Sequence, residues 1–154
     1  MTGLVLVPSV MEHVAPIADN MRKQDMDEVW AAIKTGPHSA LLRSYIISDK
    51  SWTVMEGDKP IVMFGCRLFN ALSNIGSPWL LGTDDVIKHK RQFLVEGRNI
   101  LRTEIIPRYS GLLNYVDARN TVSINWLRWL GFDIMNPEPY GALRLPFHKF
   151  TMGY

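Results

Sequence analysis

The chain has 154 residues, of which 47% are hydrophobic and 21% charged, the composition of a folded globular domain rather than a disordered segment. Its single cysteine, Cys66, excludes an internal disulfide and a thiolate zinc site, and four scattered histidines show no metal-ligand spacing. No apolar run approaches the roughly 20 residues that span a membrane, and the N-terminus lacks the pattern of a signal peptide. We therefore expect a cytoplasmic protein without a membrane partner.

The N-terminal third predicts one strand followed by three short helices. Residues 4–8 form an apolar run that ends at a proline, which favours a strand. Apolar residues then recur at helical spacing over about 12–22, from 24 or 25 to the Gly36-Pro37 stop, and over 38–48. We expect these helices to cover one face of a sheet.

From Trp52 the pattern changes to the period of two that is typical of strands. A turn at residues 57–60 joins this run to residues 61–68, so the sequence predicts a β-hairpin. Gly65, inside the second strand, indicates a bulge or a close approach of another backbone or ligand. A polar loop over 70–78 precedes residues 78–82, a short apolar run typical of a strand buried on both faces.

The C-terminal half begins with a helical pattern that runs from about Lys88 to Ile106 and ends at Pro107. Residues 112–116 predict a buried strand, and the polar residues 117–120 predict a turn. Further on, we expect a strand at 132–134, a turn at 137–140 and a final strand at 141–147. The succession of strand, long helix and strand implies a right-handed parallel crossover in an otherwise antiparallel sheet.

The turn at 117–120 leads into a helix with clear signals at both ends. Asn120 suits an N-cap, because its side-chain oxygen can accept a bond from an unpaired backbone amide of the first turn. Gly131 stands where a left-handed residue ends a helix, and Phe132 can fold back on Leu127 as in a Schellman motif. These residues alone are also compatible with a strand–helix unit that only packs in the core and carries no chemistry.

The stretch from Asn120 through Ser123 to Gly131-Phe132 resembles the last motif of the GNAT N-acetyltransferase superfamily. Together with Asn114 and residues 79–83, it is most similar to small phage-encoded GNAT-like proteins, some of which are named internal virion protein A. The resemblance implies an α/β (α+β) fold over one domain, residues 1–154. Its central sheet is expected to be mixed and mostly antiparallel, with a splayed parallel strand pair and helices on both faces.

The resemblance also implies a site for acetyl-CoA and an amine acceptor. The family polarises the acyl group with backbone amides that correspond to Leu80 and Leu81, and it places Asn120 and Ser123 beside the pantetheine arm. The family's phosphate loop is rich in glycine, whereas residues 85–92 contain none. The side chains that could hold phosphates there by charge are Lys88, His89, Lys90 and Arg91.

The proton-transfer groups of the family are altered in this sequence. Leu127 occupies the position of the usual general acid, a tyrosine, so Tyr115 on the preceding strand is the candidate acid. Glu56 and Asp84 are the candidate bases, since each follows or ends a strand near the expected cleft. A solvated surface position is the alternative for both carboxylates.

Two functions remain open from the sequence. One is an N-acetyltransferase that uses acetyl-CoA to acylate an amine on a protein or small molecule. The other is a GNAT-like module that has lost the cofactor and binds a host protein, in the host cytoplasm or packaged in a virion. Nucleic acid is the least favoured partner, because the net charge is only +2 and the basic cluster at 88–102 is a weak signal.

Overall fold

The computed structural model describes residues 3–153, and within them one seven-stranded sheet has the order β1-β2-β3-β4-β5-β7-β6. All neighbouring strands are antiparallel except β4 and β5, which are parallel and joined through α4, so the predicted crossover is confirmed. The strands are β1 Leu4–Pro8, β2 Lys50–Glu56, β3 Lys59–Asn70, β4 Ile75–Gly82, β5 Gly111–Asp117, β6 Asp133–Tyr140 and β7 Leu145–Met152.

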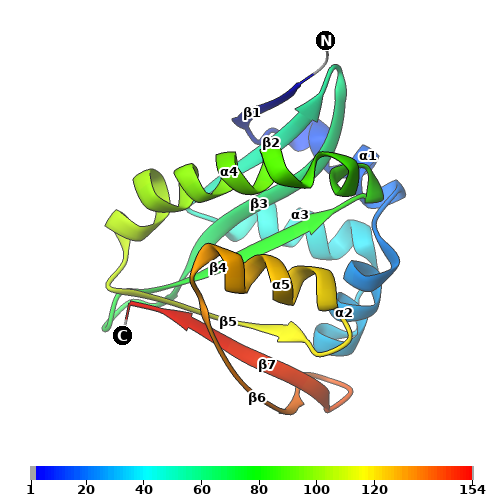
Figure 1. Cartoon of the computed structure of the whole chain (residues 1–154). Coiled ribbons are helices and arrows are strands. Elements are labelled where there is room, and N and C mark those ends of the chain that lie inside the picture. The colour runs from blue at the N-terminus through cyan, green and yellow to red at the C-terminus, as the bar shows by residue number, and fades with distance from the viewer. Residues whose placement is uncertain (1–2, 154) are drawn as a thin grey trace.

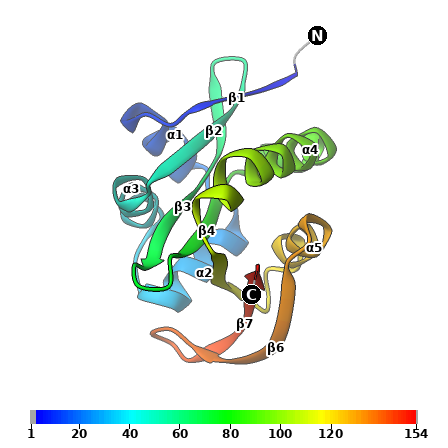
Figure 2. The ribbon, with the colours of Figure 1, turned by 90° about the vertical axis from the view of Figure 1, so that its left-hand side faces the viewer.

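Helices cover both faces of this sheet, as the sequence predicted. α1 Val14–Asp19, α2 Lys23–Ile33 and α3 Pro37–Ile47 lie on one face, and α4 Lys90–Ile100 and α5 Thr121–Leu130 lie on the other (Figures 1 and 2). A short 3-10 helix, Asp84–His89, connects β4 to α4. No helix within the described residues is long and apolar enough to cross a membrane.

The central strands are buried on both faces, which explains their unbroken apolar runs. Successive side chains of a strand point to opposite faces. Met63 therefore packs with α1 and α3, while its neighbours Val62 and Phe64 pack with Phe93 of α4. The sheet thus separates two apolar layers, and a third, around Phe150, lies beneath α5.

The two parallel strands separate soon after they begin. Only Ile75–Gly111 and Gly76–Leu112 are paired, and beyond them β4 and β5 diverge (Figure 1). A side chain spans the gap just beyond the paired residues, because Nδ2 of Asn114 donates to the carbonyl oxygen of Pro78 at 2.7 Å. The predicted splayed pair is therefore present, and its wide end lies at the carboxyl ends of both strands.

Several expected boundaries were wrong, and local geometry explains them. The turn expected at 137–140 belongs to β6, which tolerates Pro137 and Pro139 because it is an edge strand. The chain instead turns at 141–144, where Gly141 and Arg144 have positive φ. The long helix expected to continue to Ile106 ends as α4 at Ile100 and continues as a π turn and a 3-10 turn up to Arg108.

Two further boundaries also differ from the sequence-based expectation, whereas the close approach expected at Gly65 is present. The first helix is α-helical only from Val14, after a 3-10 turn at 11–13. β4 begins at Ile75, inside the expected loop. Gly65 makes the expected close approach without a bulge, since a Cβ there would lie 2.6 Å from the Lys50 carbonyl oxygen.

Replacement of Gly141 by alanine should be more damaging than the same change at Gly57. Both glycines have positive φ, which costs an L-residue about 1–2 kcal/mol. A Cβ at Gly141 would also lie 2.7 Å from Cα of Ala32 on α2, whereas nothing lies within 4 Å at Gly57. Overpacking of this kind costs typically a further 1–3 kcal/mol. Urea unfolding of the two variants measures the difference, and equal losses would contradict the tight turn.

Candidate functional site

The space between the diverging strands is a cavity of about 260 Å³, called here the splay cleft. It crosses the sheet, since its lining comes from α2 and α3 on one face and from α4 and α5 on the other. Most of the lining is apolar or aromatic. Its polar side chains are Glu28, Ser44, Asn114, Tyr115, Ser123 and Tyr140, together with the indole of Trp79 and that of Trp126.

One backbone position of β4 faces the cleft without a strand partner. The N–H and C=O of one strand residue point to the same edge, and this edge alternates along the strand. The Pro78 carbonyl accepts from Asn114 of β5. The Gly82 N–H donates to Asp25 of α2, and the Gly82 carbonyl accepts from the amide of Arg22, just before α2. The even-numbered residues of β4 therefore face β5. Thr83 N donates to the Ile61 oxygen of β3, so the odd-numbered residues face the other way.

Leu80, between Pro78 and Gly82, therefore presents its N–H and C=O to the cleft. Of the two amides that the sequence predicted to polarise an acyl group, the one at Leu80 has the required direction. The alternation turns the amide of Leu81 toward its β3 partner, Met63. Leu81 contributes only its side chain to the cleft lining.

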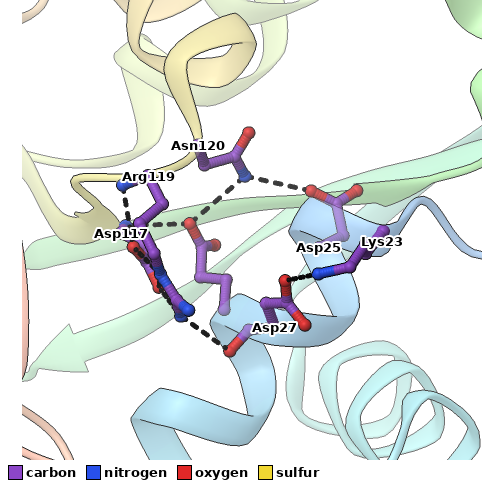
Figure 3. A network of polar contacts seen from close by, with 7 residues as sticks. Lys23, Asp25, Asp27, Asp117, Arg119 and Asn120 are labelled. Atoms are coloured by element: carbon purple, nitrogen blue, oxygen red, sulfur yellow. Dashed lines mark hydrogen bonds and ion pairs between the residues drawn. The ribbon is translucent and has the colours of Figure 1, made fainter.

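A buried polar cluster bridges the wide end of the splay, and Figure 3 shows one of its contacts, from Asn120 to Asp25. Asp25 Oδ2 accepts from the Gly82 amide at 3.0 Å, and its Oδ1 accepts from Asn120 Nδ2 at 3.1 Å and from Arg22 Nη1 at 3.1 Å. Arg22 Nη2 lies 3.4 Å from Asn120 Oδ1. Because Arg22, Asp25 and Asn120 tie β4 to the start of α5, we call them the clasp.

The clasp is shielded from water, with each of its three side chains only 1% exposed. Burial raises the pKa of Asp25, and the Arg22 guanidinium together with the Gly82 amide opposes that rise. Arg22 also lies over the ring of Trp126, 5.9 Å from its centroid. Nε of Arg22 has no hydrogen-bond partner among the described residues. The hydrogen bonds of this guanidinium are therefore made by its terminal nitrogens.

Asn120 stands at the N-cap of α5, as predicted, but its side chain does not cap the helix. Nδ2 donates to Asp25 and, at 3.3 Å, to Glu28 Oε1, while Oδ1 faces Arg22. The expectation of a side-chain cap is therefore wrong, because buried charges compete for the amide. Since both ends of this amide already have protein partners, its predicted cofactor contact would require their rearrangement.

The carboxyl group most suited to chemistry belongs to Glu28 on α2. Oε1 accepts from the backbone amide of Asp117 at 2.9 Å and from Asn120, whereas no described residue donates to Oε2. Burial raises the pKa of Glu28 from 4.5 to about 8, with a smaller contribution from the nearby Asp25 charge. The structure thus holds one oxygen of this carboxyl group in place and leaves the other available beside the cleft.

Sequence reasoning missed Glu28 entirely. The residue precedes Val29 in an ordinary amphipathic helix, and nothing local separates it from a solvated glutamate such as Glu96. Its environment depends on Asp117 and Asn120, which are 89 and 92 positions away in the chain. Only the tertiary fold reveals it.

Tyr115 and Ser123 lie in the cleft lining, on β5 and α5 respectively. The ring of Tyr115 stacks on that of Tyr140, with centroids 3.9 Å apart and planes 14° apart. Burial raises the pKa of Tyr140, and the neighbouring Tyr115 adds to that rise. Two tyrosine hydroxyl groups therefore accompany Glu28 in the lining, of which the sequence indicated one.

The remaining candidate residues lie outside the cleft lining. Glu56 contacts His89 Nε2 at 2.5 Å and Lys88 Nζ at 3.6 Å, and the bond from His89 lowers the pKa of Glu56. The side chain of Asp84 is 82% exposed and lies 3.9 Å from Nε of Arg22. Lys90 and Arg91 are exposed at the first turn of α4, with no ion pair among the described residues.

Comparison with known proteins rests on structure. No protein-family model matches the sequence, and no curated protein sequence matches it either. The spermidine N-acetyltransferase of Vibrio cholerae, solved in complex with CoA and spermine, superposes with a TM-score of 0.68 at 12% identity, over 97% of this chain and 94% of the other. The fold is that of GNAT acetyltransferases.

Two further structures support this assignment of the fold. A probable GNAT-family acetyltransferase from Chromobacterium violaceum has a TM-score of 0.65 at 17% identity and covers 97% of this chain and 86% of the other. A GNAT-family acetyltransferase from Streptococcus pneumoniae has a TM-score of 0.65 at 11% identity, over 97% and 98% of the two chains. At identities this low, the superpositions establish the GNAT fold alone, and the function must be argued from the site.

Proposed function

We propose that this protein is an N-acyltransferase that uses acetyl-CoA to acylate an amine. The observation that carries this proposal is the unpaired backbone edge of Leu80, which faces an apolar cleft between two splayed parallel strands. A donor amide there could stabilise negative charge on an acyl oxygen, an interaction that is strong where water is excluded. The GNAT fold, which the V. cholerae enzyme uses to bind CoA and spermine, supports the same reaction class.

The residues of the cleft fit the acylated arm of the cofactor. That arm is thin and carries amide groups, and the C=O of Leu80 could accept a hydrogen bond from one of them while the Leu80 N–H faces the acyl oxygen. Ser123 and Leu127 of α5 and Leu94 and Gly97 of α4 line the same passage. When bound, the cofactor would supply an activated acyl group as a thioester.

The chain offers fewer contacts to the diphosphate of the cofactor than to its acylated arm. The connection after β4 contains no glycine, so its backbone cannot wrap a diphosphate as a glycine-rich loop does. Lys88 and His89 are already engaged by Glu56. We therefore assign phosphate contacts to the exposed Lys90 and Arg91, which begin α4.

Glu28 is the candidate general base of the reaction, in place of Glu56 and Asp84. Oε2 would accept the proton that the attacking ammonium must lose. A pKa of about 8 suits this task, because a base is most effective when its pKa lies near the working pH. Tyr115 and Tyr140 are the candidate hydroxyl donors for this proton path, since both line the cleft with Glu28.

Two substitutions at Gly97 test the proposal. Gly97 lines the cleft from the middle of α4, and a Cβ there meets only Phe93, at 4.0 Å. Gly97→Leu should fill the passage and abolish release of thiol from acetyl-CoA, while replacing a helix-interior glycine should raise stability by up to about 1 kcal/mol. Gly97→Ala, the matched control, should gain similar stability and keep its activity. Equal thiol release by both variants would contradict binding in the splay cleft.

A second candidate function is a binding module that has lost the cofactor, acting on a host protein or packaged in a phage particle. The specific observation in its favour is the ion-paired state of Lys88 and His89, together with the occupied amide of Asn120. This candidate predicts that millimolar acetyl-CoA does not raise the melting temperature. A ligand that binds only the native state must raise it, so a clear shift would exclude this alternative.

A further inference from the structure

If the protein is an acyltransferase as proposed, the residues on the α2 side of the splay cleft indicate which class of amine it accepts. This side is formed by Glu28, Val29, Ala32 and Ile33 of α2, Ser44 of α3, and the stacked Tyr115 and Tyr140. Ile33 is exposed, and Glu28, Val29, Ser44 and Tyr140 are half-buried, so this side reaches the surface. An acceptor could therefore enter here without passing between α4 and α5.

The charge of the lining is minimal. Among all residues that line the cleft, Glu28 is the only acidic one, and the lining contains no lysine, arginine or histidine. Asp25 and Asp117 lie close by, but their oxygens are taken up by Arg22, Asn120, Gly82 and Arg119. When Glu28 is ionised, the cleft can therefore neutralise one positive charge, at Oε2 of this carboxylate.

The rest of this side suits an apolar group. The Tyr115–Tyr140 pair offers aromatic surface, and Val29, Ala32 and Ile33 offer aliphatic surface. An ammonium near aromatic rings gains a further attraction to their faces. A second or third ammonium on the same ligand would lose water without gaining a partner, which is unfavourable in a buried site.

We propose that the acceptor is a primary amine with one positive charge and an aromatic or aliphatic body, rather than a polyamine. Its ammonium would donate to Oε2 of Glu28, and its body would pack against the Tyr115–Tyr140 pair. This inference rests on the proposed function for the chemistry that follows binding, and on the cleft itself for the binding.

Calorimetry without acyl donor tests the inference, with 2-phenylethylamine and spermidine as probes at pH 9, where Glu28 is ionised. The wild type should bind 2-phenylethylamine at least tenfold more tightly than spermidine, and Glu28→Gln should weaken that binding at least tenfold. Because the glutamine side chain keeps an acceptor oxygen for Asp117 and Asn120, the fold should persist. Ser44→Phe, a second variant, should block 2-phenylethylamine by occupying the same side.

The outcomes separate this inference from the acyltransferase proposal. Binding of 2-phenylethylamine without any release of thiol from acetyl-CoA would support the acceptor site and contradict acyl transfer. Thiol release with spermidine but not with 2-phenylethylamine would support acyl transfer and overturn the inference. Binding of 2-phenylethylamine that is unchanged in both variants would also overturn it.

Discussion

Replacing Asp25 by alanine is expected to lower the free energy of unfolding by about 3–5 kcal/mol, since it removes one partner of a buried ion pair. Arg22 would remain 1% exposed, and its one remaining carboxylate contact among the described residues would be the longer one to the exposed Asp84, at 3.9 Å from Nε. The Gly82 amide and Asn120 Nδ2 would each lose an acceptor as well. The same change should loosen the wide end of the splay, because Asp25 contacts both sides of it.

The matched control is Lys23→Ala, two residues away on the same helix. It breaks the exposed Lys23–Asp27 pair, whose atoms are 2.7 Å apart, and should change stability by less than about 1 kcal/mol. Urea denaturation of both variants gives the comparison. A loss at Asp25 as small as the loss at Lys23 would contradict a stabilising role of the clasp between β4 and α5.

Raising the pH from 5 to 9 should destabilise the wild type through Glu28. The folded protein keeps a proton on this carboxyl group up to a pKa of about 8, whereas the unfolded chain releases it near 4.5. Between those values the folded state binds more protons, so the free energy of unfolding falls as pH rises. The stabilisation is complete below pH 4.5 and is lost through pH 8, on the order of 5 kcal/mol in all.

Glu28→Gln should remove most of that slope. Glutamine mimics the protonated acid and has no proton to lose, so the variant should match the wild type near pH 5 and exceed its stability at pH 9. The raised pKa of Asp25 contributes a slope of the same sign to both proteins, and the difference between them therefore reports Glu28. Parallel stability curves over this pH range would contradict a protonated Glu28 in the native state.

The parts of the fold that sequence reasoning predicted well are those set by local signals. The helix that ends at Gly131 is one example: Gly131 has φ of 102°, and Phe132 N donates to the Leu127 oxygen, as the Schellman pattern predicts. The parallel crossover followed from the order of strands and helices. The final turn was misplaced because prolines at 137 and 139 suggest a turn, whereas an edge strand also accepts them.

The site was only partly predictable, because its decisive contacts join distant segments. Leu80, Tyr115 and Ser123 were placed near the cleft by their positions on the splayed strands and the following helix. The clasp and the raised pKa of Glu28 depend on the contact between α2 and the start of α5, which no local sequence pattern predicts. Glu56 was a candidate base and Lys88 a candidate phosphate ligand, but the two side chains instead form an ion pair with each other.

The most direct test of the account is isothermal calorimetry of acetyl-CoA with the wild-type protein, with Gly97→Leu as the blocked form. The account predicts a saturable heat with one molecule bound per chain for the wild type, and none for Gly97→Leu. The absence of heat with both proteins at millimolar acetyl-CoA, or equal binding by both, would contradict an acyl-donor site in the splay cleft.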